Sequence, residues 1–308
     1  MQRFLDALHD RTLLFDGAMG TEIQKLELTS DSFPGGQAGF NDGLTVTCPD
    51  NIATIHHKYL DAGADCIETN TFGSNLLKLE EYNMADQAFD INRQAAEIAV
   101  RAASSYEERY VIGTMGPTGF LPSSTEETLG NTPLEDIEEA FHVQAKGLAA
   151  GGVDAILIET GNDMVEMKMA ILAAKPTGLP IMANVTFPQY GKMLLGTPVD
   201  AAYITLSGMG IDAFGVNCST GPVEMTPAID WLNHNASHPI LMVPNAGLPE
   251  NVDGCACYSM TPDIMTGLMA DILAKYHNVK IIGGCCGTTP EHIRRLRQMM
   301  DDLQAPIP

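Results

Sequence analysis

The 308-residue sequence predicts an α/β fold in which eight strand–helix units close into a single barrel. Three observations lead to this prediction. Eight short β-type runs alternate with segments of helical periodicity along the chain. The runs are nearly continuous in apolar residues, which is typical of parallel strands covered on both faces. No linker or low-complexity segment interrupts the pattern, so we expect residues 1–308 to form one domain.

The strands are expected at eight positions along the chain. In order they are TLLFD (12–16), DCIETN (65–70), YVIGT (110–114), AILIET (155–160), PIMANVTF (180–187), AFGVNC (213–218), PILMVPN (239–245) and VKIIGG (279–284). A helical segment follows each one, with Thr–Pro start signals at 132–133 and 261–262. This count favours a (β/α)8 TIM barrel over a doubly wound sheet. The dinucleotide-binding version of that sheet needs G-x-G-x-x-G after its first strand, and DGAMGTEIQ lacks it.

The composition excludes several classes of function. The net charge is −22, from 39 acidic and 17 basic residues, and no basic cluster suits a nucleic-acid partner. No run of about 18 apolar residues exists to span a membrane. The first residues lack the layout of a signal peptide, so we expect a cytoplasmic protein. The odd count of seven cysteines argues against a disulfide framework and favours thiol or metal chemistry.

Polar residues end most of the expected strands. They are Asp16, Glu68, Asn70, Glu159, Asn217, Cys218, Asn245, Cys285 and Cys286. Barrel active sites lie at the C-terminal ends of the strands, and the longer connections 25–48, 115–131 and 246–260 lie on the same face. Any one of these residues could simply cap the following helix, but helix capping does not require three cysteines. The sequence therefore predicts an active site at this end of the barrel.

The adjacent cysteines of GGCCG (283–287) are the most distinctive feature of this set. As isolated residues they fit buried filler or a strained disulfide equally well. Strands six and eight are alternate neighbours, however, so Cys218 can converge with Cys285 and Cys286. Adjacent side chains of an extended strand face opposite ways, and we expect Gly283, Gly284 and Gly287 to allow the turn that brings both thiols to one point.

Three thiolates suit Zn²⁺, which prefers four soft or borderline ligands in a tetrahedron. Cys255 or Cys257 would close the site as a fourth ligand, although their C-x-C spacing in this loop is more often incidental. A site with one open position would bind a substrate thiol. The pKa of a free alkyl thiol is about 8.5, and metal binding would deprotonate that thiol at neutral pH.

The remaining polar residues suggest an amino acid as the ligand. Asp16 and Glu159 would anchor an ammonium group, and we assign them catalytic roles. The backbone N–H groups of residues 17–20 could hold a carboxylate. The candidate substrate-binding residues are Gly17, Ala18, Met19, Asn70, Asn217 and Asn245. An amino acid that carries a thiol fits this description.

Seven stretches of the chain carry a resemblance to a known family. They are LLFDGAMGTEIQ, AGADCIETNTFGSN, IGTMGPTG, ILIET, GVNCSTGP, VPNAG and GGCCGTTPEHI, between residues 13 and 293. The sequence resembles the zinc-dependent homocysteine S-methyltransferase family, and more closely the homocysteine-binding barrel of cobalamin-dependent methionine synthase. GVNCS combined with GGCCGTTPEH is highly specific for it.

The resemblance implies that Cys218, Cys285 and Cys286 bind zinc, and that Asp16 and Glu159 bind the homocysteine amino group. It also implies that Asn245 lies beside the metal as a stand-in ligand when substrate is absent. The expected activity is methyl transfer to the thiolate of zinc-bound homocysteine, which gives methionine.

The methyl donor is expected to come from elsewhere, because the sequence lacks the cobalamin-ligand motif D-x-H-x-x-G. Betaine-using relatives place tyrosines where this chain has Gly73 and Thr160, and Trp231, the only tryptophan, lies on an expected outer helix. Because no aromatic cage for a quaternary ammonium is evident, we expect methylcobalamin on a separate corrinoid protein. The alternatives are a sulfonium or betaine donor, another thiol acceptor, or a corrinoid-docking subunit of a larger methyl-transfer assembly.

Overall fold

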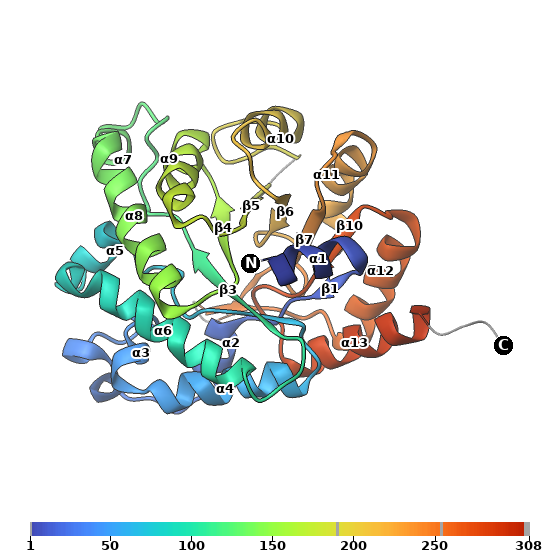
Figure 1. The fold of residues 1–308 in the computed structure, drawn as a ribbon, viewed down its shortest axis with the longest axis horizontal. Coiled ribbons are helices and arrows are strands. Elements are labelled where there is room, and N and C mark those ends of the chain that lie inside the picture. The colour runs from blue at the N-terminus through green and yellow to red at the C-terminus, as the bar shows by residue number, and fades with distance from the viewer. Residues whose placement is uncertain (1, 189–190, 253–254, 305–308) are drawn as a thin grey trace.

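The computed structural model describes residues 2–188, 191–252 and 255–304, and eight parallel strands form its centre (Figure 1). Their spatial order is β1-β10-β7-β6-β5-β4-β3-β2. A parallel bridge between Phe15 and Cys66 joins β1 to β2, the two ends of this order, so the sheet closes on itself. The predicted (β/α)8 barrel is confirmed.

Each expected β-type run contains or overlaps one barrel strand. The strands are β1 Leu13–Leu14, β2 Cys66–Glu68, β3 Tyr110–Met115, β4 Ala155–Gly161, β5 Ile181–Val185, β6 Ala213–Asn217, β7 Ile240–Val243 and β10 Val279–Ile282. The connection after β7 was expected as a loop, but it contains an antiparallel hairpin of β8 (Glu250–Val252) and β9 (Cys255–Cys257).

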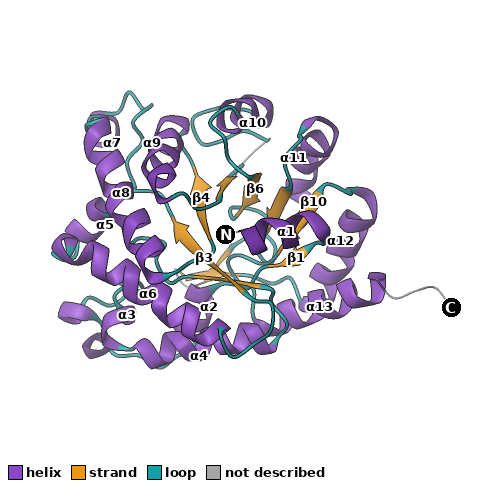
Figure 2. Ribbon diagram, in the orientation of Figure 1, coloured by secondary structure: helices purple, strands orange, loops and turns teal. Residues whose placement is uncertain are grey.

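One long helix follows each barrel strand and covers the outside of the sheet (Figure 2). These helices are α4 Pro49–Asp61, α6 Ala88–Ala103, α8 Leu134–Gly151, α9 Met164–Ala174, α10 Val199–Ser207, α11 Pro222–Asn235, α12 Pro262–Lys275 and α13 Pro290–Gln304. Four short helices lie in the connections: α2 Met19–Gln24, α3 Leu44–Thr47, α5 Leu76–Glu80 and α7 Glu127–Gly130. Thr261 caps α12 as expected, whereas the expected cap at Thr132 is wrong, because the N-cap position of α8 is Pro133 and no side chain caps it. None of the described helices is both long and apolar enough to cross a membrane.

Apolar side chains of the strands and of the N-terminal helix fill the barrel interior. Buried residues of all eight strands form one apolar cluster inside it, and Phe4 and Leu8 of helix α1 (Gln2–Asp10) belong to the same cluster. A second, larger cluster fills the space between the sheet and the helices, which explains why both faces of the strands are apolar. Because α1 covers the N-terminal end of the strands, the opposite end is left for function.

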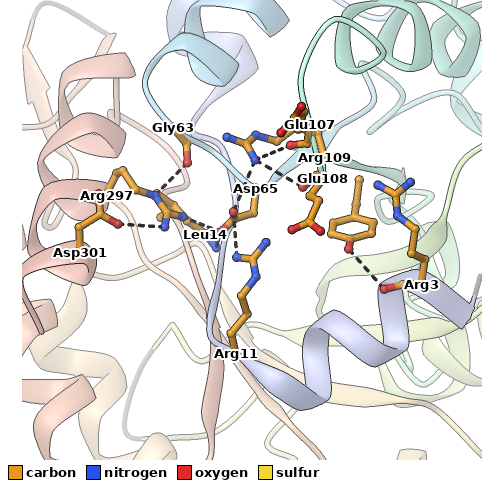
Figure 3. A network of polar contacts seen from close by, with 11 residues as sticks. Arg3, Arg11, Leu14, Gly63, Asp65, Glu107, Glu108, Arg109, Arg297 and Asp301 are labelled. Atoms are coloured by element: carbon orange, nitrogen blue, oxygen red, sulfur yellow. Dashed lines mark hydrogen bonds and ion pairs between the residues drawn. The ribbon is translucent and has the colours of Figure 1, made fainter. Parts of the chain in front are cut away.

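A buried carboxylate reinforces the closed end. Asp65, directly before β2, accepts a hydrogen bond from the Leu14 backbone at 2.8 Å and an ion pair from Arg11 at 2.9 Å (Figure 3). Arg297 of α13 pairs with the same carboxylate, and Arg109 lies 4.0 Å from it. Segments from both ends of the chain therefore meet at the seam between β1 and β2.

Candidate metal and amino-acid site

Three cysteine sulfurs converge at the C-terminal end of the barrel. The Sγ atoms of Cys218, Cys285 and Cys286 all lie within 4.8 Å of one another. Cys286 Sγ is 3.8 Å from Cys218 Sγ and 4.0 Å from Cys285 Sγ. A tetrahedral zinc with bonds of about 2.3 Å to sulfur places its ligand sulfurs roughly 3.8 Å apart. The sequence prediction that these three thiols lie together is confirmed, and their spacing fits such an ion.

The backbone turns sharply to bring the three thiols together. Cys218, at the end of β6, has φ 56° and Ser219 has φ 62°, both in the left-handed region that non-glycine residues rarely adopt. Gly287 has φ 80°, so it supports the turn after the cysteine pair as expected. Gly283 and Gly284 have no such φ, and our expectation that they provide the turn is wrong. A Cβ on Gly283 would lie 2.7 Å from Phe15 Cβ, and one on Gly284 would lie 2.5 Å from Thr288 Oγ1. These two glycines therefore permit close packing.

The three thiols share their protons unequally. Hydrogen bonds from Cys218 and Cys285 lower the pKa of Cys286 to about 3, despite burial. Hydrogen bonding to Cys218 and Cys286, together with burial, raises the pKa of Cys285 well above its ordinary value. One thiolate is thus concentrated at the centre of the group, where a cation would neutralise it.

Asn245 lies in the chain segment next to this group and has an unused side-chain oxygen. Its side chain is buried and its Oδ1 atom has no hydrogen-bond partner among the described residues. The adjacent Ala246 N–H donates to the Cys286 carbonyl at 2.9 Å, so the chain at Asn245 is tied directly to the cysteine pair. A buried acceptor without a partner is costly in free energy, and a metal ion would satisfy it. Cys257 is exposed on β9, and the side chain of Cys255 lies outside the described residues.

Tyr258 lies next to the cysteine group, and we made no prediction for it from the sequence. A Cβ on Gly287 would come within 2.4 Å of Tyr258 Cβ, which shows how closely the tyrosine packs on the turn. Burial, followed by the charge of Cys286, raises the pKa of the Tyr258 hydroxyl. Only its place in the long 246–260 connection indicated that it lies on the active-site face.

The two predicted ammonium anchors, Asp16 after β1 and Glu159 near the end of β4, lie at the same end of the barrel. Asp16 and Glu159 are 3% and 8% exposed. Burial raises the pKa of Asp16 well above its ordinary value, and a hydrogen bond from the Glu68 backbone N–H opposes this shift. Burial raises the pKa of Glu159 to about 7, opposed by the Thr160 hydroxyl and increased by the charge of Cys286. Glu159 therefore lies in the electrostatic range of the cysteine group.

Asn217 orients Glu159. Its Nδ2 group donates to Glu159 Oε2 at 3.0 Å and to Thr160 Oγ1 at 3.0 Å. Its Oδ1 atom accepts the Thr160 N–H at 2.9 Å, and Thr160 has φ 59°. Both ends of the Asn217 amide are thus occupied by the chain. We predicted a substrate-binding residue here, and the structure places its amide on the predicted ammonium anchor.

The other predicted substrate-binding residues lie around the same end of the barrel. The Ala18 N–H donates to Thr288 Oγ1 at 3.2 Å, so this donor is already used. A Cβ on Gly17 would lie 2.8 Å from both Thr288 Oγ1 and the Tyr59 ring, which accounts for glycine there. Met19 opens α2 and is partly exposed.

Asn70 connects two loops of this face. Its Nδ2 group donates to the Asn41 carbonyl at 2.9 Å, which ties the chain after β2 to the 25–48 connection. The same loops meet again where Gly73 N–H donates to Asp42 Oδ1 at 3.2 Å. Burial raises the pKa of Asp42 to about 6. Asp42 also influences Glu159 electrostatically, a relation that the sequence did not suggest because Asp42 lies in an irregular loop.

Comparisons with known proteins show which family the chain matches. The profile described as Homocysteine S-methyltransferase matches residues 13–300. The methionine synthase of Mycobacterium tuberculosis is 40% identical over 312 residues, which cover 98% of this chain and 26% of that protein. The methionine synthase of Mycobacterium leprae is 40% identical over 302 residues, with 95% and 24% covered. The chain therefore spans about a quarter of the length of the curated relatives it matches.

Solved structures show the same fold. The metallated form of the homocysteine methyltransferase MmuM from Escherichia coli has a TM-score of 0.75 at 22% identity and covers 96% of this chain and 99% of that one. The oxidised form of the same protein has a TM-score of 0.77 at 23% identity. At this level of identity, the likeness supports the barrel architecture alone.

Proposed function

The chain belongs to the homocysteine S-methyltransferase family, and we propose that it transfers a methyl group onto the thiolate of homocysteine to give methionine. The observation that carries this proposal is the joint presence of a three-thiol group and two buried carboxyls at one end of the barrel. The thiol group suits a ligand sulfur held on a metal, and the carboxyls suit an ammonium group. Homocysteine contains both.

Zn²⁺ is the metal that we propose, held by Cys218, Cys285 and Cys286. When bound, it would act as a Lewis acid that keeps a coordinated thiol ionised at neutral pH. The spacing of the three sulfurs and the unpartnered Oδ1 of Asn245 support this assignment. The cysteine ligands would be positioned by the left-handed turn at Cys218 and by the packing of Tyr258 on Gly287.

The carboxyls of Asp16 and Glu159 would bind and orient the substrate ammonium group. Asn217 holds Glu159 in place through its amide, and the Glu68 backbone N–H holds Asp16. With both ends of the substrate fixed, its sulfur faces the donor in one orientation. Catalysis by the chain would then consist mainly of positioning, because the reacting thiolate is a strong nucleophile.

The donor that we propose is methylcobalamin carried by a separate corrinoid protein. Two positions that hold cage tyrosines in betaine-using relatives contain no aromatic ring here. At Gly73, a Cβ would approach Asp42 Oδ2 at 3.1 Å, and the Thr160 hydroxyl lies on Glu159 and Asn217. Trp231 lies on the outer helix α11 and packs edge-on against Tyr203 of α10, with ring centroids 6.1 Å apart. These contacts favour a bulky donor that is presented by a partner over a small quaternary ammonium.

A donor comparison tests this proposal. Zinc-loaded protein receives homocysteine together with methylcobalamin, S-methylmethionine or betaine, and methionine is measured by chromatography. We expect methionine with methylcobalamin, and none from a Cys218→Ala control that lacks a metal ligand. Turnover with betaine but not with methylcobalamin would contradict the donor. No methionine with any of the three would contradict the activity.

A further inference from the structure

A third carboxyl group, that of Glu68, lies near the two ammonium anchors. Glu68 is the last residue of β2, and the alternation of side chains along a strand turns it to the same side as Cys66, which lies inside the barrel. Its backbone N–H donates to Asp16 Oδ2 at 3.1 Å, so the Asp16 carboxyl lies directly against it. Burial and the charges of Glu159 and Asp16 raise its pKa well above the ordinary value. Carboxyls from the ends of β1, β2 and β4 therefore converge.

These three carboxyls differ in their hydrogen bonding. Asp16 accepts a backbone N–H, and Glu159 accepts the Asn217 amide and the Thr160 hydroxyl. Within the described residues, the Glu68 carboxyl receives no hydrogen bond that would stabilise it. It therefore has its full accepting capacity available toward the space that it shares with the other two.

The described part of the chain supplies no cation to these three carboxyls. None of the described arginine, lysine or histidine side chains pairs with Asp16, Glu68 or Glu159. Burial disfavours the charged form of all three carboxyls, so a cationic ligand that binds here would stabilise their ionised form. A primary ammonium group has three N–H donors, which is one for each carboxyl.

We infer that Glu68 is a third binding residue for the substrate ammonium group and that it sets the preference of the site for thiols that carry an amine. This inference rests on the proposed function, which supplies an amino acid as the ligand. Glu68 and Asp16 would accept hydrogen bonds from the ammonium group at the ends of adjacent strands, and Glu159 would accept a third from β4. A thiol without an amine would bring no cationic partner for the three carboxyls and would gain nothing from Glu68.

The test compares two ligands on zinc-loaded wild-type protein and on Glu68→Gln. Homocysteine carries the amine, and 4-mercaptobutanoate has the same thiol and carboxylate without it. Calorimetric titration of both gives a ratio of affinities for each protein. Because a hydrogen bond between charged groups is lost, we expect Glu68→Gln to bind homocysteine about tenfold more weakly and 4-mercaptobutanoate within about twofold of wild type. Glu80→Gln, an exposed change on α5, is the matched control and should alter neither affinity.

A ratio of affinities in Glu68→Gln that equals the wild-type ratio would overturn the inference, whether both affinities stay the same or both fall equally. A wild-type protein that does not prefer homocysteine would overturn it as well. Zinc content, measured in parallel, should stay at the wild-type level, because Glu68 is not among the proposed metal ligands. A loss of zinc would instead mean that Glu68 supports metal binding. Failure of the proposed function has another signature. The wild-type protein would then prefer homocysteine, and Glu68→Gln would narrow that preference, yet no donor would yield methionine.

Discussion

Replacement of Asn217 by alanine is expected to weaken homocysteine binding in a way that depends on pH. The Asn217 amide donates to Glu159 Oε2 at 3.0 Å, and burial raises the pKa of that carboxyl to about 7. In the wild-type protein, Glu159 is therefore about half ionised at pH 7. A hydrogen bond to a charged group contributes roughly 1.5–3 kcal/mol, which corresponds to about one to two pKa units. Without the amide, roughly 1–10% of Glu159 remains ionised at pH 7.

In the proposed function the ammonium group of homocysteine binds the ionised carboxyl, so the affinity of Asn217→Ala should fall about five- to fiftyfold at pH 7. The loss should shrink at pH 9, where Glu159 regains its charge. Calorimetry at both pH values measures it, and 4-mercaptobutanoate corrects for ionisation of the ligand thiol. Asn235→Ala, a change at the exposed last residue of α11, is the control. An equal loss at pH 7 and pH 9 would refute the role of Asn217 in keeping Glu159 ionised.

Three further changes test other parts of the structure. Gly287→Ala would put a Cβ 2.4 Å from Tyr258 Cβ at φ 80°, which costs at least about 1 kcal/mol, and elemental analysis should find less zinc. Asp65→Asn should lower the free energy of unfolding by roughly 1.5–3 kcal/mol in urea, with homocysteine affinity unchanged, because its partners lie at the closed end of the barrel. Burial raises the pKa of Glu166 from 4.5 to about 7, so the folded state holds a proton between these pH values that the unfolded chain has released. This carboxyl lowers stability as pH rises through that window, and Glu166→Gln should gain stability relative to wild type from pH 4.5 to pH 7.

The sequence predicted the barrel well because its signals are regular. Apolar runs and helical segments repeat eight times, and each run coincides with a barrel strand. Helix α1 was not predicted, because a short amphipathic segment before the first strand has no partner in the repeat. The hairpin of β8 and β9 was missed for a similar reason, since its two strands have only three residues each.

The sequence indicated which residues belong to the candidate site, but it did not indicate which contacts their side chains make. Strand ends indicated Asp16, Glu159 and the three cysteines, because polar residues at the ends of apolar strands are conspicuous. The partner of each side chain depends on local backbone geometry, such as the left-handed conformations at Cys218 and Thr160. These conformations turn the Asn217 amide onto Glu159, and no spacing rule in the sequence indicates them.

We propose that the homocysteine sulfur joins a metal held by Cys218, Cys285 and Cys286. X-ray absorption at the zinc edge of the loaded protein, recorded before and after addition of homocysteine, tests it most directly. We expect three sulfur ligands and one oxygen or nitrogen ligand before addition, with Asn245 Oδ1 as a candidate, and four sulfur ligands afterwards. A sulfur count that stays the same when homocysteine binds would show that the substrate sulfur does not coordinate the metal.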